Sequence, residues 1–337
     1  MTETPMADKK TGAGSISEIF VAEPSPPFND PRKQREYWGR SWGVNSEYGA
    51  LRAVYMHRPG NELKAVRNES YVPALNAFVD KSLRYYWTGS ALPDIPRLQA
   101  EHDAFADLLR SHGAEVVYSR NSPEHLTKTL NTRDVAVALP GGVAVMRMAS
   151  SMRRGEEQVA TRSLTAFGVP ILRTLNGSAV AEGGNVMFLD EKHAAVGVSI
   201  RTNREGIRQL KEEFEIAGVE LYVVTCPGYQ LFHIDCMMAV VAAKTALVDR
   251  THLPYDFLMH LEKLGFSLID ACPEEGEFAI NGLTLSPGVF AMIAGFDKTA
   301  EVLTKSGITV IPVDWTESMK NGGGLHCASC PLIRENA

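Results

Sequence analysis

Three carboxylates, an imidazole and a thiol recur at regular intervals along the chain. Asp134, Glu182, Asp235 and Cys327 are separated by 48, 53 and 92 residues, and the last interval is close to two of the others. His233 stands two residues before Asp235. If the chain is built from equivalent units, each carboxylate or thiol opens a unit at an equivalent position. A ring of such units would bring all five groups to a common axis.

This set of groups is chemically coherent. An ionised cysteine is a nucleophile, and a neighbouring imidazole can accept and donate protons. Carboxylates that are buried together repel one another and raise one another's pKa values unless a cation lies between them. A planar guanidinium has five N–H donors that suit carboxylates, and its central carbon is an electrophile that sulfur can attack. The set therefore favours a small guanidino compound as ligand.

The elements that must position these groups follow a repeated pattern of an amphipathic helix, a glycine and a short apolar run. Each glycine stands where the end of a helix needs a left-handed residue, and each apolar run is typical of a buried strand. The helix patterns cover residues 101–110, 156–166, 204–216, 255–264 and 298–305, and they are followed by Gly113, Gly168, Gly218, Gly265 and Gly307. Successive glycines are 55, 50, 47 and 42 residues apart, which indicates five related units.

Two further strand patterns precede four of the helices, so each unit is predicted as ββαβ. The paired runs are 134–139 and 143–148, 185–189 and 194–200, 237–242 and 245–248, and 282–285 and 289–293. The first unit begins at residues 51–57 and lacks one strand, for which residues 331–334 are the candidate. A period of about 50 residues predicts an α/β array, and the sharing of the first unit by both ends favours a ring. The alternative is one doubly wound sheet.

Composition predicts a globular cytoplasmic protein. The 337 residues are 45% hydrophobic, which is enough for a sizeable core, and the formal net charge of −6 argues against a nucleic-acid partner. No apolar run approaches the roughly 20 residues that cross a bilayer, and the amino terminus lacks a secretory pattern, so no membrane is expected. The five cysteines are too few and too odd in number for a disulfide framework.

Metal and redox sites are the alternative uses of the same residues. Residues 327–330 form a C-x-x-C, which suits a redox pair or half of a zinc site, but no second C-x-x-C or H-x-x-x-H accompanies it. The carboxylates could hold calcium, although they stand on separate strands and no acidic loop is present. We therefore predict no metal and no cofactor.

The openings of the units resemble those of the guanidino-group-modifying enzymes, the superfamily of arginine deiminases, dimethylargininases and amidinotransferases. The stretches that carry the resemblance, in the family's order, are MHRPG at 56–60, EHDAF at 101–105, TRD at 132–134, EGG at 182–184, SIRT at 199–202, HID at 233–235 and GGGLHC at 322–327. Any one of them is weak, but seven in order are specific and cover most of the chain after Trp42. The resemblance implies a fivefold pseudo-symmetric α/β propeller, or pentein, of ββαβ units.

The resemblance also implies roles for the site residues. Cys327 would attack the guanidinium carbon. His233 would protonate the departing amine and then activate water against the covalent S-amidino intermediate. Asp134, Glu182 and Asp235 would bind and orient the guanidinium, with Asp235 also lying close to His233.

The substrate-binding residues are less closely matched to the family. Arg201 is where deiminases place a contact to the substrate carboxylate, and a solvated arginine at a strand end is the alternative. Asn185 stands where deiminases often have aspartate. Deiminases also tend to carry an arginine shortly before the cysteine. The glycine run has none, so the carboxylate contact is either incomplete or supplied by Arg153 or Arg154.

The resulting hypothesis is a cofactor-free hydrolase that cleaves a C–N bond of arginine or an N-substituted relative. An amidinotransferase is the first alternative, because GGGLHC is closer to the amidinotransferase form while the helix at 101–110 is closer to the deiminase form. A noncatalytic binding protein of the same ring architecture is the second, and the intact Cys327, His233 and acidic set argue against it.

Two segments are expected. Residues 1–46 are predicted as an extended or partly helical arm, because residues 1–30 are rich in Thr, Ser, Pro and Lys without a sustained period. Residues 31–46 carry Tyr37, Trp38 and Trp42 among charges, which fits a short helix on the body or a contact in a homo-oligomer. Residues 47–337 are predicted as a single catalytic domain.

Overall fold

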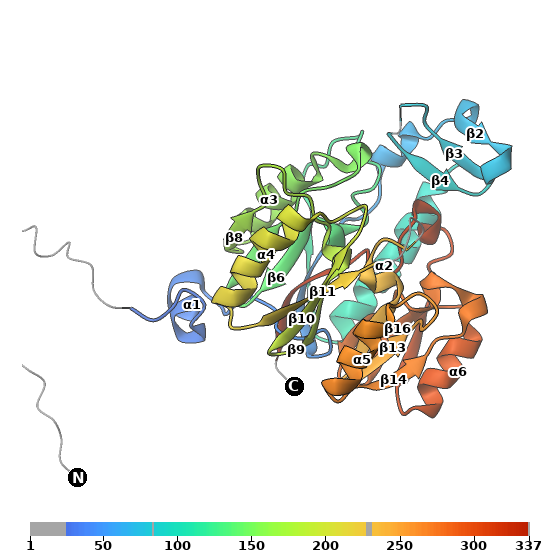
Figure 1. The fold of residues 1–337 in the computed structure, drawn as a ribbon. Helices are drawn as coiled ribbons and strands as arrows, with labels where there is room; N and C mark the ends of the chain where they lie inside the picture. The colour runs from blue at the N-terminus through green and yellow to red at the C-terminus, as the bar shows by residue number, and fades with distance from the viewer. Residues whose placement is uncertain (1–24, 83, 227–230, 336–337) are drawn as a thin grey trace, which may run out of the picture.

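The computed structural model describes residues 25–82, 84–226 and 231–335, and strands and helices alternate along most of that length (Figure 1). The first element is α1 (Pro31–Trp38), in the predicted arm. The Asp30 side chain accepts hydrogen bonds from the backbone amides of Arg32 and Lys33 and so caps its first turn. Residues 1–24 of the predicted arm lie outside the described residues.

Four consecutive units have the predicted ββαβ order. In each unit two antiparallel strands are followed by a helix and by a third strand that is parallel to the second. The elements are β6 (Ala136–Leu139), β7 (Gly142–Val145), α3 (Glu156–Ala166) and β8 (Ile171–Thr174); β9 (Val186–Asp190), β10 (His193–Val198), α4 (Arg204–Ile216) and β11 (Glu220–Thr225); β12 (Met238–Ala242), β13 (Thr245–Val248), α5 (Tyr255–Lys263) and β14 (Ser267–Asp270); and β15 (Leu283–Ser286), β16 (Val289–Ile293), α6 (Asp297–Lys305) and β17 (Thr309–Val313).

The first unit is completed by the end of the chain, as predicted. Strand β18 (Cys330–Glu335) is antiparallel to β1 (Ala50–Met56), which is parallel to β5 (Glu115–Tyr118) beyond α2 (Ile95–Ser111). A small sheet that the sequence did not predict is inserted between β1 and α2. Its strands are β2 (Tyr71–Val72), β3 (Ala77–Val79) and β4 (Tyr86–Thr88).

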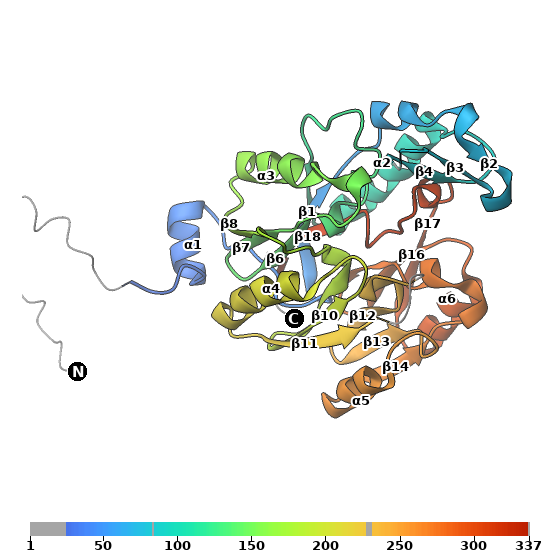
Figure 2. The same ribbon diagram turned by 45° about the horizontal axis from the view of Figure 1, so that its top comes forward.

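The strands form separate three-stranded sheets, so the alternative of one doubly wound sheet is wrong. The architecture is a mixed α/β fold, and Figure 2 shows α5 and α6 at the periphery of the molecule. Among the described residues no set of strands closes into a barrel. The fivefold propeller therefore stays a prediction.

The five glycines that were predicted to end helices all have left-handed backbone geometry, with φ between 72° and 85°. A residue with a Cβ atom is strained in that conformation, so glycine fixes where each helix stops and the next strand begins. This local rule explains why the units could be read from the sequence.

Short 3-10 turns open the hairpins, and predicted site residues lie in or directly before the first three of them. They are η5 (Thr132–Asp134), η7 (Gly183–Asn185), η8 (Ile234–Cys236) and η10 (Glu277–Ala279). Turn η7 contacts both η5 and η8, although the three turns are about 50 residues apart in sequence. The hairpin openings therefore converge, as the spacing argument required.

The arm and the surface have two features that bear on the predicted partners. The amide of Gly43 donates to the Leu332 carbonyl at 3.0 Å, which joins the end of the predicted arm to β18, while Tyr37 and Trp38 on α1 are exposed.

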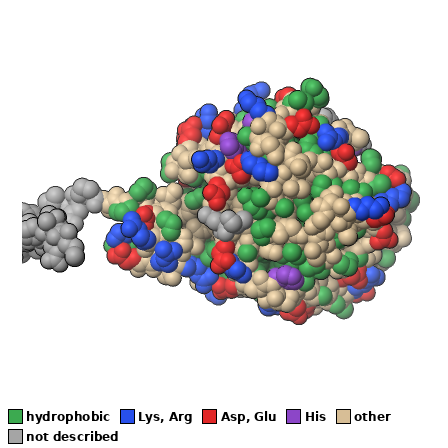
Figure 3. Space-filling model, turned by 90° about the horizontal axis from the view of Figure 1, so that it is seen from below, with side chains coloured by type: hydrophobic (Ala, Val, Ile, Leu, Met, Phe, Trp, Pro, Cys, Tyr) green, Lys and Arg blue, Asp and Glu red, His purple; other side chains and the backbone are tan. Residues whose placement is uncertain are grey.

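Acidic and basic side chains alternate over the face in Figure 3, with hydrophobic side chains between them. Within the described part of the chain, none of the helices combines the length and the apolar character needed to span a bilayer.

Trp315 connects the last unit to α2 and to the glycine run, and it supports our first prediction. Its side chain is fully buried, its ring lies edge-on to Phe105 with centroids 5.5 Å apart, and its indole N–H donates to the Gly323 carbonyl at 3.2 Å. We expect Trp315→Ala to lower the free energy of unfolding by about 3–5 kcal/mol.

Trp38→Ala is the matched control, because 42% of Trp38 is exposed. It should cost less than about 1 kcal/mol. Urea unfolding followed by circular dichroism measures both variants, and equal losses would contradict the role given to Trp315.

Candidate active site

A cavity of about 360 Å³ lies where the hairpin openings meet. Its lining contains six of the eight residues predicted for the site: Asp134, Arg153, Glu182, Arg201, His233 and Cys327. They come from four different units of the chain, with Asp134 and Arg153 in one unit and Glu182 and Arg201 in the next. The structure therefore brings together the predicted nucleophile, the imidazole and two of the three carboxylates.

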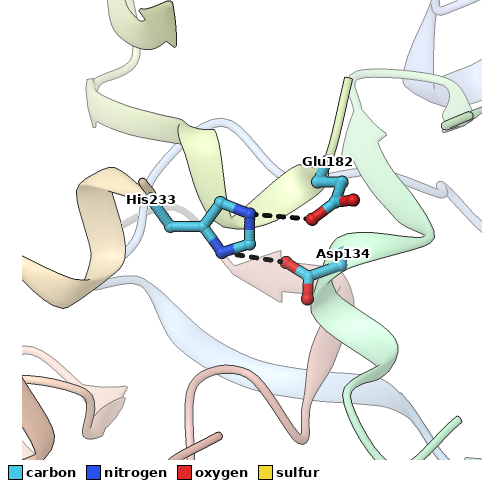
Figure 4. A group of neighbouring side chains, drawn as sticks. All are labelled: Asp134, Glu182 and His233. Carbon is cyan, nitrogen blue, oxygen red and sulfur yellow. Dashed lines mark hydrogen bonds and ion pairs between the residues drawn. The ribbon is translucent and has the colours of Figure 1, made fainter. Parts of the chain in front are cut away.

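His233 lies between two carboxylates from different units (Figure 4). Its Nε2 is 3.0 Å from Glu182 Oε2, and its Nδ1 is 3.6 Å from Asp134 Oδ1. Burial alone would lower the pKa of the imidazole, but Asp134 and Glu182 outweigh burial and raise it. The two carboxylates therefore favour the protonated form of His233 inside the site.

Gly184 is needed for this convergence. A Cβ atom on Gly184 would lie 2.8 Å from both Asp134 Oδ1 and His233 Nδ1, which is closer than real Cβ contacts allow. The amide of Gly184 also donates to Asp134 Oδ1 at 3.1 Å. A glycine at this position lets three units approach one another while the backbone binds the carboxylate.

Arg153 holds the other oxygen of Asp134. Its Nη1 donates to Asp134 Oδ2, its Nη2 donates to the Asn131 carbonyl at 2.9 Å, and it forms a bidentate pair with Glu156. Burial raises the pKa of Glu156 to about 7 even beside this arginine. The guanidinium of Arg153 is thus occupied by protein groups, and in this structure it positions Asp134.

Arg201 reaches the cavity from the loop after β10. Its Nη1 is 3.5 Å from Glu182 Oε1, and its guanidinium carbon lies 4.5 Å from the centroid of the Phe232 ring. Asn185 does not line the cavity. Its amide nitrogen donates to the hydroxyls of Ser199 and Thr202, both at 3.1 Å, so it holds the loop that carries Arg201.

Cys327 is buried at the base of the cavity, where its thiol lies 3.7 Å from Asp235 Oδ2. The Cys327 amide donates to the side-chain oxygen of Asn281 at 3.2 Å. Burial, Asp235 and Asp134 together raise the pKa of the thiol well above its usual value. The resting thiol is therefore protonated.

Asp235 does not line the cavity, and the histidine that hydrogen-bonds to its carboxylate is His326 rather than His233. Its Oδ2 lies 2.7 Å from His326 Nδ1, and His326 Nε2 lies 3.8 Å from Glu47 Oε2. Glu47 in turn pairs with Arg133 at 2.9 Å. Burial and Arg133 lower the pKa of His326, but Asp235 and Glu47 outweigh them and raise it. A buried charge chain thus leads from Glu47 to the thiol.

The sequence reasoning missed Asn281, Glu277 and His326. Asn281 lies 46 residues after Asp235 and 46 residues before Cys327, so it fills the gap in the periodic series. Extending the period would have found it, because the amide of Asn281 donates to the Asp235 carbonyl and its oxygen binds the Cys327 amide. Glu277 lines the cavity four residues earlier.

The cluster of Asp134, Glu182 and His233 also has a spacing that metal ligands show, with one ligand atom of each within 4.8 Å of the others. Both ring nitrogens of His233, however, face carboxylate oxygens. The two carboxylates favour an imidazole with protons on both nitrogens, and that form has no free lone pair for a metal. The geometry favours an ion cluster of protein groups.

A family model described as N,N dimethylarginine dimethylhydrolase, eukaryotic, matches residues 90–334. The uncharacterized protein YkgA of Bacillus subtilis is 28% identical over 295 residues, which covers 86% of this chain and 94% of that protein. The N(G),N(G)-dimethylarginine dimethylaminohydrolase of Pseudomonas aeruginosa is 25% identical over 237 residues, covering 70% and 89%. The arginine deiminase of Mycobacterium avium is 25% identical over 410 residues, covering 87% and 98%.

Two solved structures show the same fold. A dimethylarginine dimethylaminohydrolase from Pseudomonas aeruginosa, complexed with citrulline, has a TM-score of 0.67 at 21% identity and covers 84% of this chain and 100% of its own. An amidinotransferase of saxitoxin biosynthesis from Microseira wollei has a TM-score of 0.68 at 14% identity, covering 88% and 98%.

The family match spans most of the chain and includes every predicted site residue. The relatives named as a dimethylaminohydrolase and a deiminase fall in the same superfamily as the sequence resemblance. This chain belongs to the N,N dimethylarginine dimethylhydrolase family of guanidino-modifying enzymes, and it is a hydrolase that acts on carbon–nitrogen bonds of linear amidines.

Proposed function

We propose that the enzyme hydrolyses a C–N bond of arginine, or of an N-substituted arginine such as dimethylarginine, through an S-amidino intermediate on Cys327. The observation that carries the proposal is the placement of Cys327, His233 and two carboxylates around one cavity. A volume of about 360 Å³ suits a small guanidino compound. The family match and the named activities of the relatives support the same substrate class.

Substrate binding and nucleophile activation are linked by charge. Asp134 and Glu182 accept hydrogen bonds from the substrate guanidinium, and Arg201 binds its carboxylate. The positive charge of the bound guanidinium offsets the carboxylates that raise the pKa of the Cys327 thiol. The thiol then loses its proton to solvent, and the thiolate forms beside its electrophile.

The chemical steps follow from that pairing. The thiolate attacks the guanidinium carbon and forms a C–S bond, which gives a tetrahedral intermediate. His233 donates a proton to the departing nitrogen, the C–N bond breaks, and the amine leaves. The neutral imidazole then takes a proton from water, the water oxygen attacks the amidino carbon, and the C–S bond breaks to release a urea product and the thiolate.

Arg153 and Asn185, which the sequence predicted as substrate-binding, act in this scheme as positioning residues. Arg153 holds Asp134, and Asn185 holds the loop that carries Arg201. Asp235 contacts the Cys327 thiol and raises its pKa. Chelation of metals should leave the turnover rate unchanged, because every step uses groups of this chain or of the substrate.

An amidinotransferase is the second candidate, because the first half-reaction is the same and an amine would replace water in the second. The form of GGGLHC and the fold shared with the Microseira amidinotransferase favour it. Incubation with arginine, in the presence and absence of glycine or lysine, separates the two candidates. Ornithine that forms only when an amine is added would establish the transferase.

For the architecture, we propose that the five units close into a pseudo-fivefold propeller within a single domain of residues 47–337. The repeated sheet order and the contacts of β18 with β6 and of β15 with both β1 and β12 support this arrangement. A cytoplasmic location and a homo-oligomer built through the aromatic arm stay predictions.

Removal of the nucleophile tests the proposed reaction. Cys327→Ser should reduce turnover of arginine and dimethylarginine to below about one thousandth, because the thiolate is lost. Cys272→Ser is the control, since Cys272 lies outside the cavity lining, and it should keep its activity. Mass spectrometry of acid-quenched wild-type enzyme should find an amidino adduct on Cys327. Full turnover by Cys327→Ser would refute the mechanism.

The buried series of charged groups that ends at Cys327 predicts opposite effects of substitutions at Asp235 and His326. Asp235→Asn removes a negative charge beside Cys327, which lowers the pKa of the thiol, so alkylation by iodoacetamide at pH 7 should be about tenfold faster. His326→Gln removes the cation that offsets Asp235, so alkylation should be about tenfold slower.

Peptide mass spectrometry measures the alkylation of Cys327 itself, and near-ultraviolet circular dichroism checks the packing of each variant. If both variants react at the wild-type rate, Asp235 and His326 do not control the thiol.

A further inference from the structure

A serine, a histidine and a glutamate that the proposed reaction does not use lie in hydrogen-bond contact in a second cavity. Ser119 Oγ is 2.5 Å from His57 Nδ1, and His57 Nε2 is 3.0 Å from Glu62 Oε1. All three residues line a cavity of about 300 Å³. Among the described residues, none that lines this cavity also lines the catalytic cavity.

The fold of the first unit places the serine beside the histidine. Strands β1 and β5 are parallel, and their last residues, Met56 and Tyr118, are paired. His57 and Ser119 therefore stand at the carboxyl ends of neighbouring strands, and the Ser119 amide donates to the Met56 carbonyl at 2.9 Å. The crevice outside the carboxyl ends of parallel strands is where α/β proteins commonly bind ligands.

Glu62 faces the other side of the imidazole from η2 (Asn61–Ala65). Its Oε1 also accepts a hydrogen bond from the Gly60 amide at 2.8 Å. Burial raises the pKa of Glu62, but His57 and the Gly60 amide outweigh burial and lower it. An ionised carboxylate can only accept hydrogen bonds, so in the neutral imidazole the proton is on Nε2. Nδ1 then has a lone pair that accepts the Ser119 hydroxyl.

The exposure of these groups suits a nucleophile and its base. His57 and Glu62 are only 6% and 7% exposed, whereas Ser119 is half-buried. Asn61 lines the same cavity, and its side chain makes no hydrogen bond within residues 25–82, 84–226 and 231–335. Its amide N–H groups are therefore available to an oxygen atom of a ligand, as an oxyanion requires.

We propose that Ser119, His57 and Glu62 form a second nucleophilic site, which hydrolyses small uncharged esters. The three roles are those of a Ser–His–carboxylate triad in which the two ring nitrogens are exchanged. The site shares no residue with the proposed reaction at Cys327, so the failure of either proposal leaves the other standing.

The reaction needs no co-reactant other than water. The Ser119 hydroxyl proton passes to His57 Nδ1 while Oγ bonds to the carbonyl carbon of the ester, and Asn61 donates to the oxyanion. Nδ1 gives that proton to the alkoxy oxygen, the C–O bond breaks, and the alcohol leaves an acyl group on the serine. Water then gives a proton to Nδ1 and attacks the acyl carbon. Nδ1 returns the proton to Oγ as the carboxylic acid is released.

The charges of the lining favour an uncharged ester. Arg58 is occupied by Asp103, because its Nε and Nη2 donate to the two carboxylate oxygens, both at 2.7 Å. Glu124 lines the cavity and is exposed. An anionic ester would meet the negative charges of Glu62 and Glu124, which repel it.

Serine-directed labelling of the full-length protein tests the site. A Cys327→Ala background removes the competing thiol without adding a hydroxyl. The probes are a biotinylated alkyl fluorophosphonate, which phosphonylates a serine and releases fluoride, and p-nitrophenyl acetate. Peptide mass spectrometry should find the phosphonyl group on Ser119. Ser119→Ala should lower both labelling and ester hydrolysis at least about tenfold, and His57→Gln should slow both about a hundredfold.

Ser122→Ala is the matched control. Ser122 lines the same cavity, but its hydroxyl contacts the Thr129 hydroxyl at 3.1 Å. This variant should react with both probes at the rate of the parent. Circular dichroism checks that each variant is folded, and Glu62→Gln provides a second test of the base, with labelling slowed at least about tenfold.

Three results would overturn the assignment. The first is a parent protein that is not labelled, or is labelled only at another residue. The second is labelling that survives Ser119→Ala. The third is a folded His57→Gln or Glu62→Gln variant that reacts at the parent rate, because the imidazole and the carboxylate would then be structural partners of Ser119 only.

Discussion

Mutual repulsion among buried carboxylates is the constraint on which the rest of the site depends. Asp134, Glu182 and Asp235 reach one region from three units, and each is stabilised by a cation from elsewhere in the chain. His233 lies between the first two carboxylates, and His326 lies against the third. The units must therefore pack against one another in a single arrangement. Displacement of any hairpin opening would leave a buried charge without its partner.

The same constraint explains the small and amide-bearing residues at the openings. Gly184 leaves room for Asp134 and His233, and Gly324 has the Asn281 backbone and side chain within 2.9 Å of where its Cβ atom would lie. Asn281 then links the Asp235 carbonyl to the Cys327 amide. Cys327, the proposed nucleophile, is placed by backbone contacts on a crowded turn, so its position depends more on the fold than on the conformation of its own side chain.

Local rules made much of this structure predictable. The glycines after the helices, the paired strand patterns and the interval of about 50 residues predicted the ββαβ units, and the missing strand of the first unit predicted the role of the last strand. Contacts that depend on choosing among partners were not predictable. Nothing in the sequence states that Asp235 pairs with His326 rather than His233, or that Arg153 is occupied by Glu156. The short strands of residues 71–88 have too few residues to show a period.

The placement of charges also connects binding with reactivity. In the free enzyme, burial, Asp235 and Asp134 keep the Cys327 thiol protonated, so a neutral ligand in the cavity leaves it unreactive. In the proposed reaction, a guanidinium brings the missing positive charge, and it does so at the carbon that the sulfur attacks. In that scheme the group that identifies the substrate also activates the proposed nucleophile, and selectivity for cations follows from the electrostatics of the site even where shape would admit a neutral compound.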